Sequence, residues 1–325
     1  MGRPKLTMAL SLYDRHIPFF DGTVSVRDVD LNVLAVGESN SLRDGLNRHH
    51  RMLAEQEFDA CEVSLSSYVM AKSQGWPLTA IPVFPRRLFS QSHIWVNAEK
   101  SIRSPKDLIG RKVGVITFQT TLSVQVKGDL QDEYGVPWRD IEWYIASEEP
   151  IKFVPPEGVT LRQISKEKKL TRMLEEGEID ALVTPRPPPG TIDGKSKIRR
   201  LFADCRQEEV GYFRKHGFFP VMHVMAFKEE SVQRYPSFPA AVTEAFQKAH
   251  EICQSYYADP NWTSLVWTRH LFEEEREVMA GDLWPMGLRG NSDNLERFLG
   301  YLLDQGLLSE NLSFQGLFVK DHTLY

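Results

Sequence analysis

The chain has 325 residues, of which 42% are hydrophobic and 26% charged, with a formal net charge of −5 at pH 7. This composition is that of a globular protein without the broad basic surface that nucleic-acid binding requires. Cys61, Cys205 and Cys253 form no C-x-x-C pair, which argues against structural zinc or a disulfide framework and fits a reducing compartment.

The first 15 residues contain basic side chains but no apolar core of the length found in secretory signals. No run of about 18 apolar residues is present that could span a membrane. These features predict a soluble, cytoplasmic protein that binds neither a membrane nor nucleic acid. Self-association into a homo-oligomer stays open.

Short apolar strands alternate with helical patterns, which is typical of an α/β fold. In the first third we expect strands over residues 6–14, 29–36, 60–65, 78–84 and 92–97. A strand then begins at Lys112, and a helix after it ends near Gly135. Apolar residues at period 3.6 predict helices over residues 236–257, 270–281 and 292–308.

Two segments form a near-repeat: RMLAEQEFDACEVSLS from Arg51 and RMLEEGEIDALVTPRP from Arg172. Each predicts a helix end, a turn and a strand that opens with Asp-Ala. The match is either a coincidence or the mark of two similar lobes, whose strands lead toward a shared cleft at their carboxyl ends. In the second case one lobe supplies Glu62, Ser64, Ser66 and Ser67, and the other supplies Thr184 and Arg186.

Several arginines are candidate anion ligands, because a guanidinium matches a carboxylate with two parallel hydrogen bonds. Arg86 and Arg87 follow a predicted strand, and we expect only one of them to face a ligand; two solvated loop arginines are the alternative. Arg186 lies in the stiff segment PRPPPG, which would hold it at a fixed angle.

The triplet Tyr13-Asp14-Arg15 ends the first strand and could supply a donor, a base and an anion clamp, or form a self-satisfied turn. Hydroxyl groups near presumed strand ends or helix starts could bind an anion, cap a helix, or do both. They belong to Ser64, Ser66, Ser67, Thr120 and Thr121.

The sequence gives little indication of a metal. No H-E-x-x-H motif is present, and His49 and His50 are neighbours on a helix predicted to be polar. His270 and Glu274 share a helix face that continues into further glutamates, which a solvated acidic face explains better than a metal site. No phosphate-binding or dinucleotide motif appears either, so we expect no metal and no organic cofactor.

Segments along nearly the whole chain together resemble one family. They are YDR at 13–15, EVSLSSY at 62–68, IPVFPRR at 81–87, LQDEYGVP at 130–137, Arg186-Pro-Pro, GFFPVMH at 217–223 and DLWPMG at 282–287. The pattern is similar to the 4,5-dihydroxyphthalate decarboxylase family, which has the fold of type II periplasmic binding proteins. The chain departs from it at Met286, where the family more often has Tyr, and near Val124 and Gln125, where relatives usually have Trp. A different substrate would follow if these positions line the pocket.

The resemblance implies a two-lobed α/β fold with the ligand cleft between the lobes. Lobe one would comprise residues 1–112 and 226–325, and the inserted lobe two residues 113–225. The implied activity is cofactor-free decarboxylation of a hydroxylated aromatic dicarboxylate such as 4,5-dihydroxyphthalate, giving protocatechuate. The partner would then be a small aromatic carboxylate. The alternatives are a non-catalytic binding protein or sensor for such an acid, or another reaction on the same scaffold.

Such a reaction needs a carboxylate clamp, a base facing a phenol and an acid over the ring, because direct loss of CO2 would leave an aryl anion. For the clamp we expect Arg186 with Arg86 or Arg15. Histidine suits proton transfer near neutral pH, so His223 and His93 are the catalytic candidates, with Glu62 as a reserve base. The remaining expected substrate-binding residues are Tyr13, Ser64, Ser66, Ser67, Arg87, Gln119, Thr120, Thr121, Phe219 and Trp284.

The segment HGFFPVMH, residues 216–223, carries two histidines. If Val221 to Phe227 crosses between lobes as a strand, His223 lies near the cleft, whereas His216 lies seven residues earlier, beyond Pro220. We expect His223 to act in proton transfer or ligand binding and His216 to matter less. The alternative for His223 is a core histidine bonded to the backbone.

Overall fold

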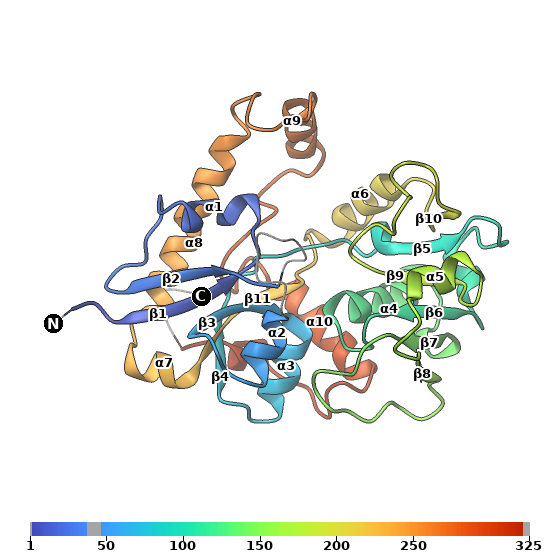
Figure 1. The fold of residues 1–325 in the computed structure, drawn as a ribbon, viewed down its shortest axis with the longest axis horizontal. Helices are drawn as coiled ribbons and strands as arrows, with labels where there is room; N and C mark the ends of the chain where they lie inside the picture. The colour runs from blue at the N-terminus through green and yellow to red at the C-terminus, as the bar shows by residue number, and fades with distance from the viewer. Residues whose placement is uncertain (1, 38–46, 321–325) are drawn as a thin grey trace. The chain divides into compact units, whose positions relative to one another are not determined.

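The computed structural model describes residues 2–37 and 47–320. The chain divides into two compact units (Figure 1). Unit 1 comprises Met1–Arg86, His223–Ser292 and Ser313–Tyr325, and unit 2 comprises Arg87–Met222 and Asp293–Leu312. These bounds differ from the predicted ones. Residues 87–112 belong to unit 2 because strand β5 (Ile94–Asn97) pairs there, and most of helix α10 (Ser292–Asp304) belongs there as well.

Unit 1 is built on a mixed sheet with the strand order β2-β1-β3-β11-β4. Its strands are β1 (Lys5–Leu10), β2 (Asp30–Ala35), β3 (Ala60–Ser64), β4 (Leu78–Ile81) and β11 (His223–Lys228). Its helices are α1 (Ile17–Phe20), α2 (Arg48–Leu53), α3 (Leu65–Ser73), α7 (Glu229–Arg234), α8 (Phe238–Tyr256) and α9 (Thr268–Val278). β1 runs parallel to β2 and β3, whereas β11 runs antiparallel to β3 and β4.

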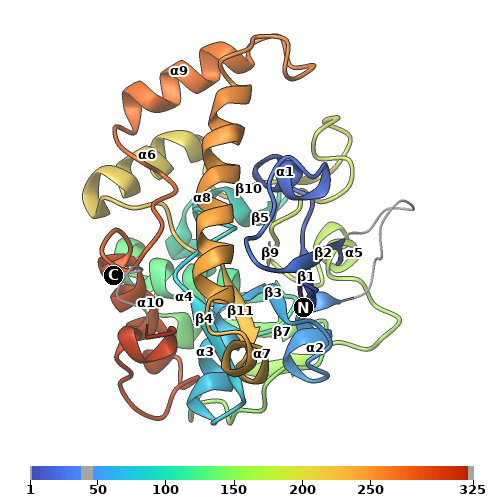
Figure 2. The same ribbon diagram turned by 90° about the vertical axis from the view of Figure 1, so that its left-hand side faces the viewer.

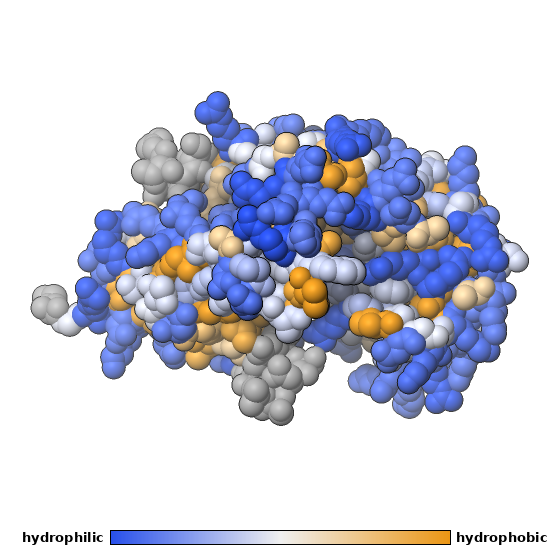
Figure 3. Space-filling model, turned by 90° about the horizontal axis from the view of Figure 1, so that it is seen from above, coloured by the Kyte–Doolittle hydropathy of each residue, from blue (hydrophilic) through white to orange (hydrophobic). Residues whose placement is uncertain are grey.

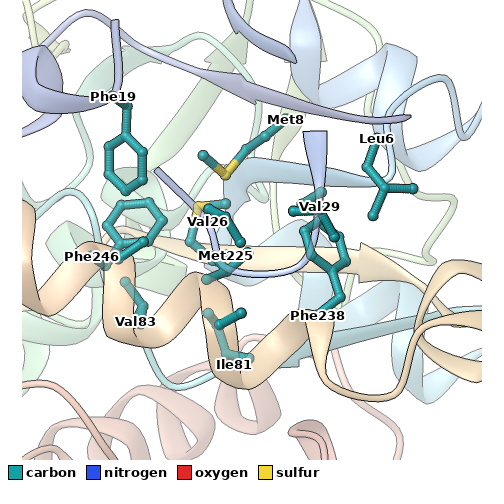
Figure 4. Packing of buried hydrophobic residues seen from close by; sticks show 14 of the residues in the cluster. Leu6, Met8, Phe19, Val26, Val29, Ile81, Val83, Met225, Phe238 and Phe246 are labelled. Atoms are coloured by element: carbon teal, nitrogen blue, oxygen red, sulfur yellow. The ribbon is translucent and has the colours of Figure 1, made fainter. Parts of the chain in front are cut away.

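The core of unit 1 lies between this sheet and α8. Met8 from β1 and Met225 from β11 share one buried cluster with Phe238 and Phe246 from α8 (Figure 4). Buried residues recur along α8 at helical spacing, as the sequence predicts for this segment. Figure 2 shows α8 as the long orange helix that leads toward α9.

Unit 2 contains a second mixed sheet, with the strand order β10-β5-β9-β6-β7-β8. The strands besides β5 are β6 (Lys112–Val115), β7 (Glu142–Ile145), β8 (Leu161–Gln163), β9 (Ala181–Val183) and β10 (Ile198–Arg200). The helices besides α10 are α4 (Thr121–Tyr134), α5 (Leu170–Glu175) and α6 (Cys205–His216). Gly128 of α4 faces the ring of Tyr301 on α10, and a Cβ there would lie 2.3 Å from that ring. The two helices therefore approach at a distance that only glycine permits.

The near-repeat has the same structure in both units. In unit 1 it forms α2 and then β3, and in unit 2 it forms α5 and then β9. The aspartate before each strand makes the same contact: Asp59 accepts from the backbone of Thr7 on β1, and Asp180 from that of Lys112 on β6. Each strand also has one parallel neighbour, β1 or β6, and one antiparallel neighbour, β11 or β5. The similarity therefore extends beyond sequence to topology.

The surface face in Figure 3 is mostly hydrophilic, with small separate hydrophobic patches. None of the α9 residues is buried, and His270 and Glu274 are exposed, as predicted for a solvated acidic face. No helix within residues 2–37 and 47–320 has the length and apolar character needed to cross a membrane.

Candidate functional site

A fully buried carboxylate, Glu62, lies in unit 1 where the parallel strands β1 and β3 approach their carboxyl ends. Its Oε2 accepts from the backbone of Ser11 at 3.0 Å. Its Oε1 accepts from the Tyr13 hydroxyl at 3.3 Å and from His223 Nδ1 at 2.5 Å, and it pairs with Arg48 Nη2 at 3.0 Å. A charge taken out of water requires this density of partners, so Glu62 is held in one orientation.

Arg48 is the counter-ion of this carboxylate and is itself buried. Its Nε donates to the carbonyl of Glu62 at 2.9 Å, and its Nη1 donates to the carbonyl of Val36 at 3.2 Å. Asn47 fixes the helix that carries it by accepting from the backbone of His49 and His50. Burial raises the pKa of Glu62, but Arg48 and His223 outweigh burial and hold it well below its usual value. Glu62 is therefore an anion at neutral pH.

His223 opens β11 and is aligned with Ser64 of β3. A carboxylate only accepts hydrogen bonds, so the contact with Glu62 places the proton on Nδ1 and leaves Nε2 as an acceptor. Within the described part of the chain, Nε2 has no hydrogen-bond partner. Burial lowers the pKa of His223 to about 4, against the opposing effect of Glu62. The ring is therefore a neutral base, and the described residues leave its Nε2 lone pair unused.

His49 lies next to this base, its ring 5.0 Å from that of His223 at an angle of 79°. Its Nδ1 accepts from the backbone N–H of Ser64 at 3.1 Å. Burial, then Arg48 and His223, lower its pKa well below 6.5, so the neutral ring carries its proton on Nε2. The two imidazoles are thus complementary: His223 presents an acceptor and His49 presents a donor.

Arg86 places a cation at the same edge of the sheet. Its carbonyl accepts from the backbone N–H of His223 at 3.3 Å, and its side chain is half-buried. Burial lowers the pKa of His223 and Glu62 raises it, and the positive charge of Arg86 lowers it further. Among the residues that the structure describes, its guanidinium has no hydrogen-bond or ion-pair partner. It is therefore the cation of this cluster that is available for an anionic ligand.

The triplet Tyr13-Asp14-Arg15 sits beside this cluster. Arg15 lies between two aromatic rings, 4.2 Å from the centroid of Tyr13 and 4.4 Å from that of Trp284. Its Nε donates to the carbonyl of Pro85 at 2.7 Å, and its Nη1 donates to Asp14 at 3.2 Å. The structure therefore brings together the predicted residues Tyr13, Arg15, Glu62, Arg86, His223 and Trp284, all within unit 1.

The three predicted serines of unit 1 contribute less directly. Ser64 acts through its backbone N–H, which orients His49. Ser66 and Ser67 are buried on α3, and the Ser66 hydroxyl contacts the sulfur of Met70 at 4.0 Å.

The other predicted residues belong to unit 2 and include two with structural contacts. Gln119 is buried, and its side-chain amide makes a reciprocal pair of hydrogen bonds with the backbone of Ile151, at 2.6 and 3.1 Å. Arg87 is buried, and its Nη1 donates to the carbonyl of Phe219 at 2.8 Å. These contacts tie both side chains to loop backbone.

Further predicted residues of unit 2 lie near strand and helix ends. Phe219 stacks on Phe89, Thr120 bonds to Ser123 at the start of α4, and Thr121 is buried. His93 is half-buried and ends the short helix η2 (Gln91–His93) before β5, where its carbonyl accepts from the backbone of Thr184. Arg186 is exposed.

The two histidines of HGFFPVMH have different partners in different units. His223 bonds to Glu62 in unit 1, whereas His216 in unit 2 contacts Glu133 at 2.9 Å. The described residues contain no group of three His, Cys, Asp or Glu side chains placed to hold a metal ion.

Sequence reasoning missed Arg48 and His49. The helix 48–53 is short and its letters RHHRML are mostly polar, so the sequence predicts a solvated face. The available signal was the position of this helix immediately before the strand that carries Glu62, because a helix packed on its own strand must direct one side toward the sheet.

Comparison with known proteins gives the relatives of this chain. A family model described as NMT1/THI5 like matches residues 45–144. A 4,5-dihydroxyphthalate decarboxylase of Comamonas testosteroni is 31% identical over 327 residues, which cover 98% of this chain and 97% of that protein. One from Pseudomonas putida is 30% identical over 221 residues, covering 66% of this chain and 83% of that protein.

Solved structures with low sequence identity share the fold. The alkanesulfonate-binding protein SsuA of Xanthomonas axonopodis pv. citri is 12% identical with a TM-score of 0.61, covering 98% of this chain and 99% of that one. The sulphonate-binding SsuA of Escherichia coli is 10% identical with a TM-score of 0.58, covering 98% of each chain. The desulfurization enzyme DSZB is 14% identical with a TM-score of 0.50, covering 98% and 96%. The predicted two-lobed α/β fold of the type II periplasmic-binding-protein kind is confirmed, and the chain belongs to the 4,5-dihydroxyphthalate decarboxylase family.

Proposed function

We propose that this chain catalyses the cofactor-free decarboxylation of a hydroxylated aromatic dicarboxylate of the 4,5-dihydroxyphthalate type. Family membership supports the reaction class. The observation that carries the proposal is the bond from His223 Nδ1 to the buried carboxylate of Glu62, which leaves Nε2 as a base beside the His49 ring.

The chemistry requires three proton transfers. The O–H bond of the hydroxyl para to one carboxylate breaks, and its proton passes to His223 Nε2. Negative charge then enters the ring, and the carbon that bears the carboxylate gains a proton. The bond to the carboxylate breaks, its electron pair restores the aromatic ring, and CO2 leaves. His223 returns its proton to the phenolate.

The cluster suits the first transfer. The imidazolium formed on His223 would be stabilised by the anionic carboxylate of Glu62 at 2.5 Å. Glu62 itself is a poor base, because its partners hold its pKa well below the usual value. We therefore assign Glu62 to positioning His223 and fixing its tautomer, in place of the reserve-base role predicted from sequence.

The remaining roles follow from charge and hydrogen-bonding capacity. Arg86 is assigned to a substrate carboxylate, since its guanidinium has no ion-pair partner among the described residues. His49 would donate from Nε2 to a substrate oxygen. His93 remains our candidate for the second proton transfer, and Arg186 remains a candidate second clamp.

The alternative is a protein that binds an aromatic acid without chemistry. The observation that favours it is the fold, since the SsuA structures belong to sulfonate-binding proteins. DSZB is described as an enzyme, so this fold also accommodates catalysis.

The two functions are distinguished by CO2 release. Purified protein, with and without a chelator, is incubated with 4,5-dihydroxyphthalate and related hydroxyphthalates, and CO2 and the ring product are measured. Turnover that depends on His223 and persists in the chelator supports the proposal. Binding without turnover across the panel would establish the binding protein instead.

A further inference from the structure

His16 carries a buried hydrogen-bond acceptor that the reaction above does not use. The side chain is 1% exposed, and its Nδ1 lies 2.7 Å from the carbonyl of Ser11. A carbonyl only accepts, so Nδ1 holds the proton and Nε2 holds a lone pair. Nε2 has no hydrogen-bond partner within residues 2–37 and 47–320. Because buried polar atoms are rarely left unpaired, this nitrogen calls for a donor that these described residues do not supply.

A cavity of about 20 Å³ adjoins this ring within unit 1. This volume suffices for about one water-sized polar group. Its walls are largely apolar and include Arg15, Phe246, His250, Trp284 and Met286. An edge-on contact with Phe246, with ring centroids 5.7 Å apart, helps fix the His16 ring.

Arg15 adds a positive charge to the same cavity. Its Nε and Nη1 bond to Pro85 and Asp14, and its plane is held between Tyr13 and Trp284. Among the described residues its Nη2 has no hydrogen-bond partner. The cavity therefore offers a neutral hydrogen-bond acceptor, His16 Nε2, beside a cationic donor, Arg15. This pair suits a ligand hydroxyl next to a second oxygen that is negative or accepts a hydrogen bond.

The cavity is joined to the candidate site through one short segment. The N–H of Ser11 donates to Glu62 while its carbonyl accepts from His16. Two residues later, Tyr13 donates to Glu62 while its ring lies 5.1 Å from that of His16. The cavity and the cluster therefore share the segment from Ser11 to His16.

We propose that this cavity is the subsite for a ring hydroxyl of the ligand, with His16 Nε2 accepting its hydrogen and Arg15 facing the adjacent oxygen. The assignment rests on the proposed function for its ligand class, hydroxylated aromatic dicarboxylates. It adds a specificity determinant: a ligand without the hydroxyl leaves Nε2 unpaired and binds more weakly.

The test compares phthalate and 4-hydroxyphthalate by calorimetric titration in a His223→Leu background, because the single hydroxyl could otherwise bind to His223 Nε2. In that background we expect 4-hydroxyphthalate to bind at least ~10-fold more tightly than phthalate, in line with one hydrogen bond to His16. Adding His16→Phe, which keeps a ring but removes the acceptor, should make the two affinities converge while that for phthalate stays within about twofold of the His223→Leu protein.

Equal affinities for the two ligands in the His223→Leu protein, or a hydroxyl preference that survives the addition of His16→Phe, would overturn the assignment. So would a proportional loss of both affinities in a folded double variant, which would mark His16 as structural. If circular dichroism shows that the double variant does not fold, the comparison in the His223→Leu protein still decides. Release of CO2 is measured separately on the wild-type protein: a hydroxyl preference without wild-type turnover would refute the proposed function and leave the subsite standing.

Discussion

His223→Asn and His216→Asn form a matched pair of perturbations, because each histidine bonds to a glutamate but only His223 belongs to the candidate site. Asparagine can still donate from its amide to Glu62, and Glu62 keeps Arg48, Ser11 and Tyr13 as partners. We therefore expect His223→Asn to fold, with a stability loss of about 1–3 kcal/mol for a weakened hydrogen bond to a charged group.

The expected catalytic effect is far larger. Asparagine cannot accept the phenol proton, so turnover should fall by at least ~100-fold, the lower end for an acid–base group. The dissociation constant for a non-reactive aromatic dicarboxylate should change little. His216→Asn should retain near wild-type turnover, since Glu133 keeps its contacts with Lys215 and Arg297. CO2 release, calorimetry and thermal unfolding of both variants provide these three quantities.

Near-normal turnover in a folded His223→Asn variant would refute the assignment of the base. An equal loss in both variants would also refute it, because a general effect of removing a histidine–glutamate contact would then explain the data.

Further outcomes can be checked with the same assays. Burial lowers the pKa of His223 to about 4, and the base must be unprotonated to act. We therefore expect kcat/KM to stay level from pH 8 toward pH 5 and to fall only as pH drops through about 4. A fall of kcat/KM with a midpoint near pH 6.5 would contradict this. Arg86→Lys keeps the charge but loses the planar fork, so ligand affinity should drop by about 1–3 kcal/mol, and Arg186→Lys tests the same role in unit 2; unchanged affinity in either would remove that arginine from the clamp. Glu62→Val alone leaves the charge of Arg48 buried without its carboxylate and should cost about 3–5 kcal/mol of stability. Adding Arg48→Leu should recover at least ~2 kcal/mol without restoring activity. A double variant no more stable than the single one would show that loss of the ion pair does not cause the destabilisation. His93→Asn should lower turnover if this residue supplies the second proton, and wild-type turnover would remove it from the mechanism.

The fold followed from sequence because its signals are local. Period-3.6 apolar spacing located α8, and the Asp-Ala opening of the near-repeat located β3 and β9. The boundary between the units did not follow, since β5 joins the second sheet through pairing with β9 and β10, residues far away in sequence. The residue types at positions 94–97 do not specify β9 and β10 as the pairing partners.

The candidate site followed only in part, for a related reason. Glu62 and His223 were found because each lies on a strand near a presumed ligand edge. Arg48 escaped because its burial depends on an ion pair that a helical pattern cannot show, and polar letters on a short helix ordinarily indicate solvent. His16 escaped because its significance is an unpaired nitrogen, which only coordinates reveal.

Comparison of the two halves of the near-repeat shows why the charges of unit 1 indicate function. By the alignment of the repeats, Glu62 corresponds to Val183 and His49 to Leu170, and both of these unit 2 residues are buried and apolar. The strand registers place Ser92 of unit 2 where unit 1 has His223, since Met225 is opposite Glu62 and Ile94 is opposite Val183. The same helix–turn–strand unit therefore folds without a counterpart of Glu62, His49 or His223, while Lys169 stands where unit 1 has Arg48. Because apolar residues generally serve at least as well as a buried ion pair for stability, folding alone does not account for the cluster in unit 1. We propose that a role in binding or chemistry does.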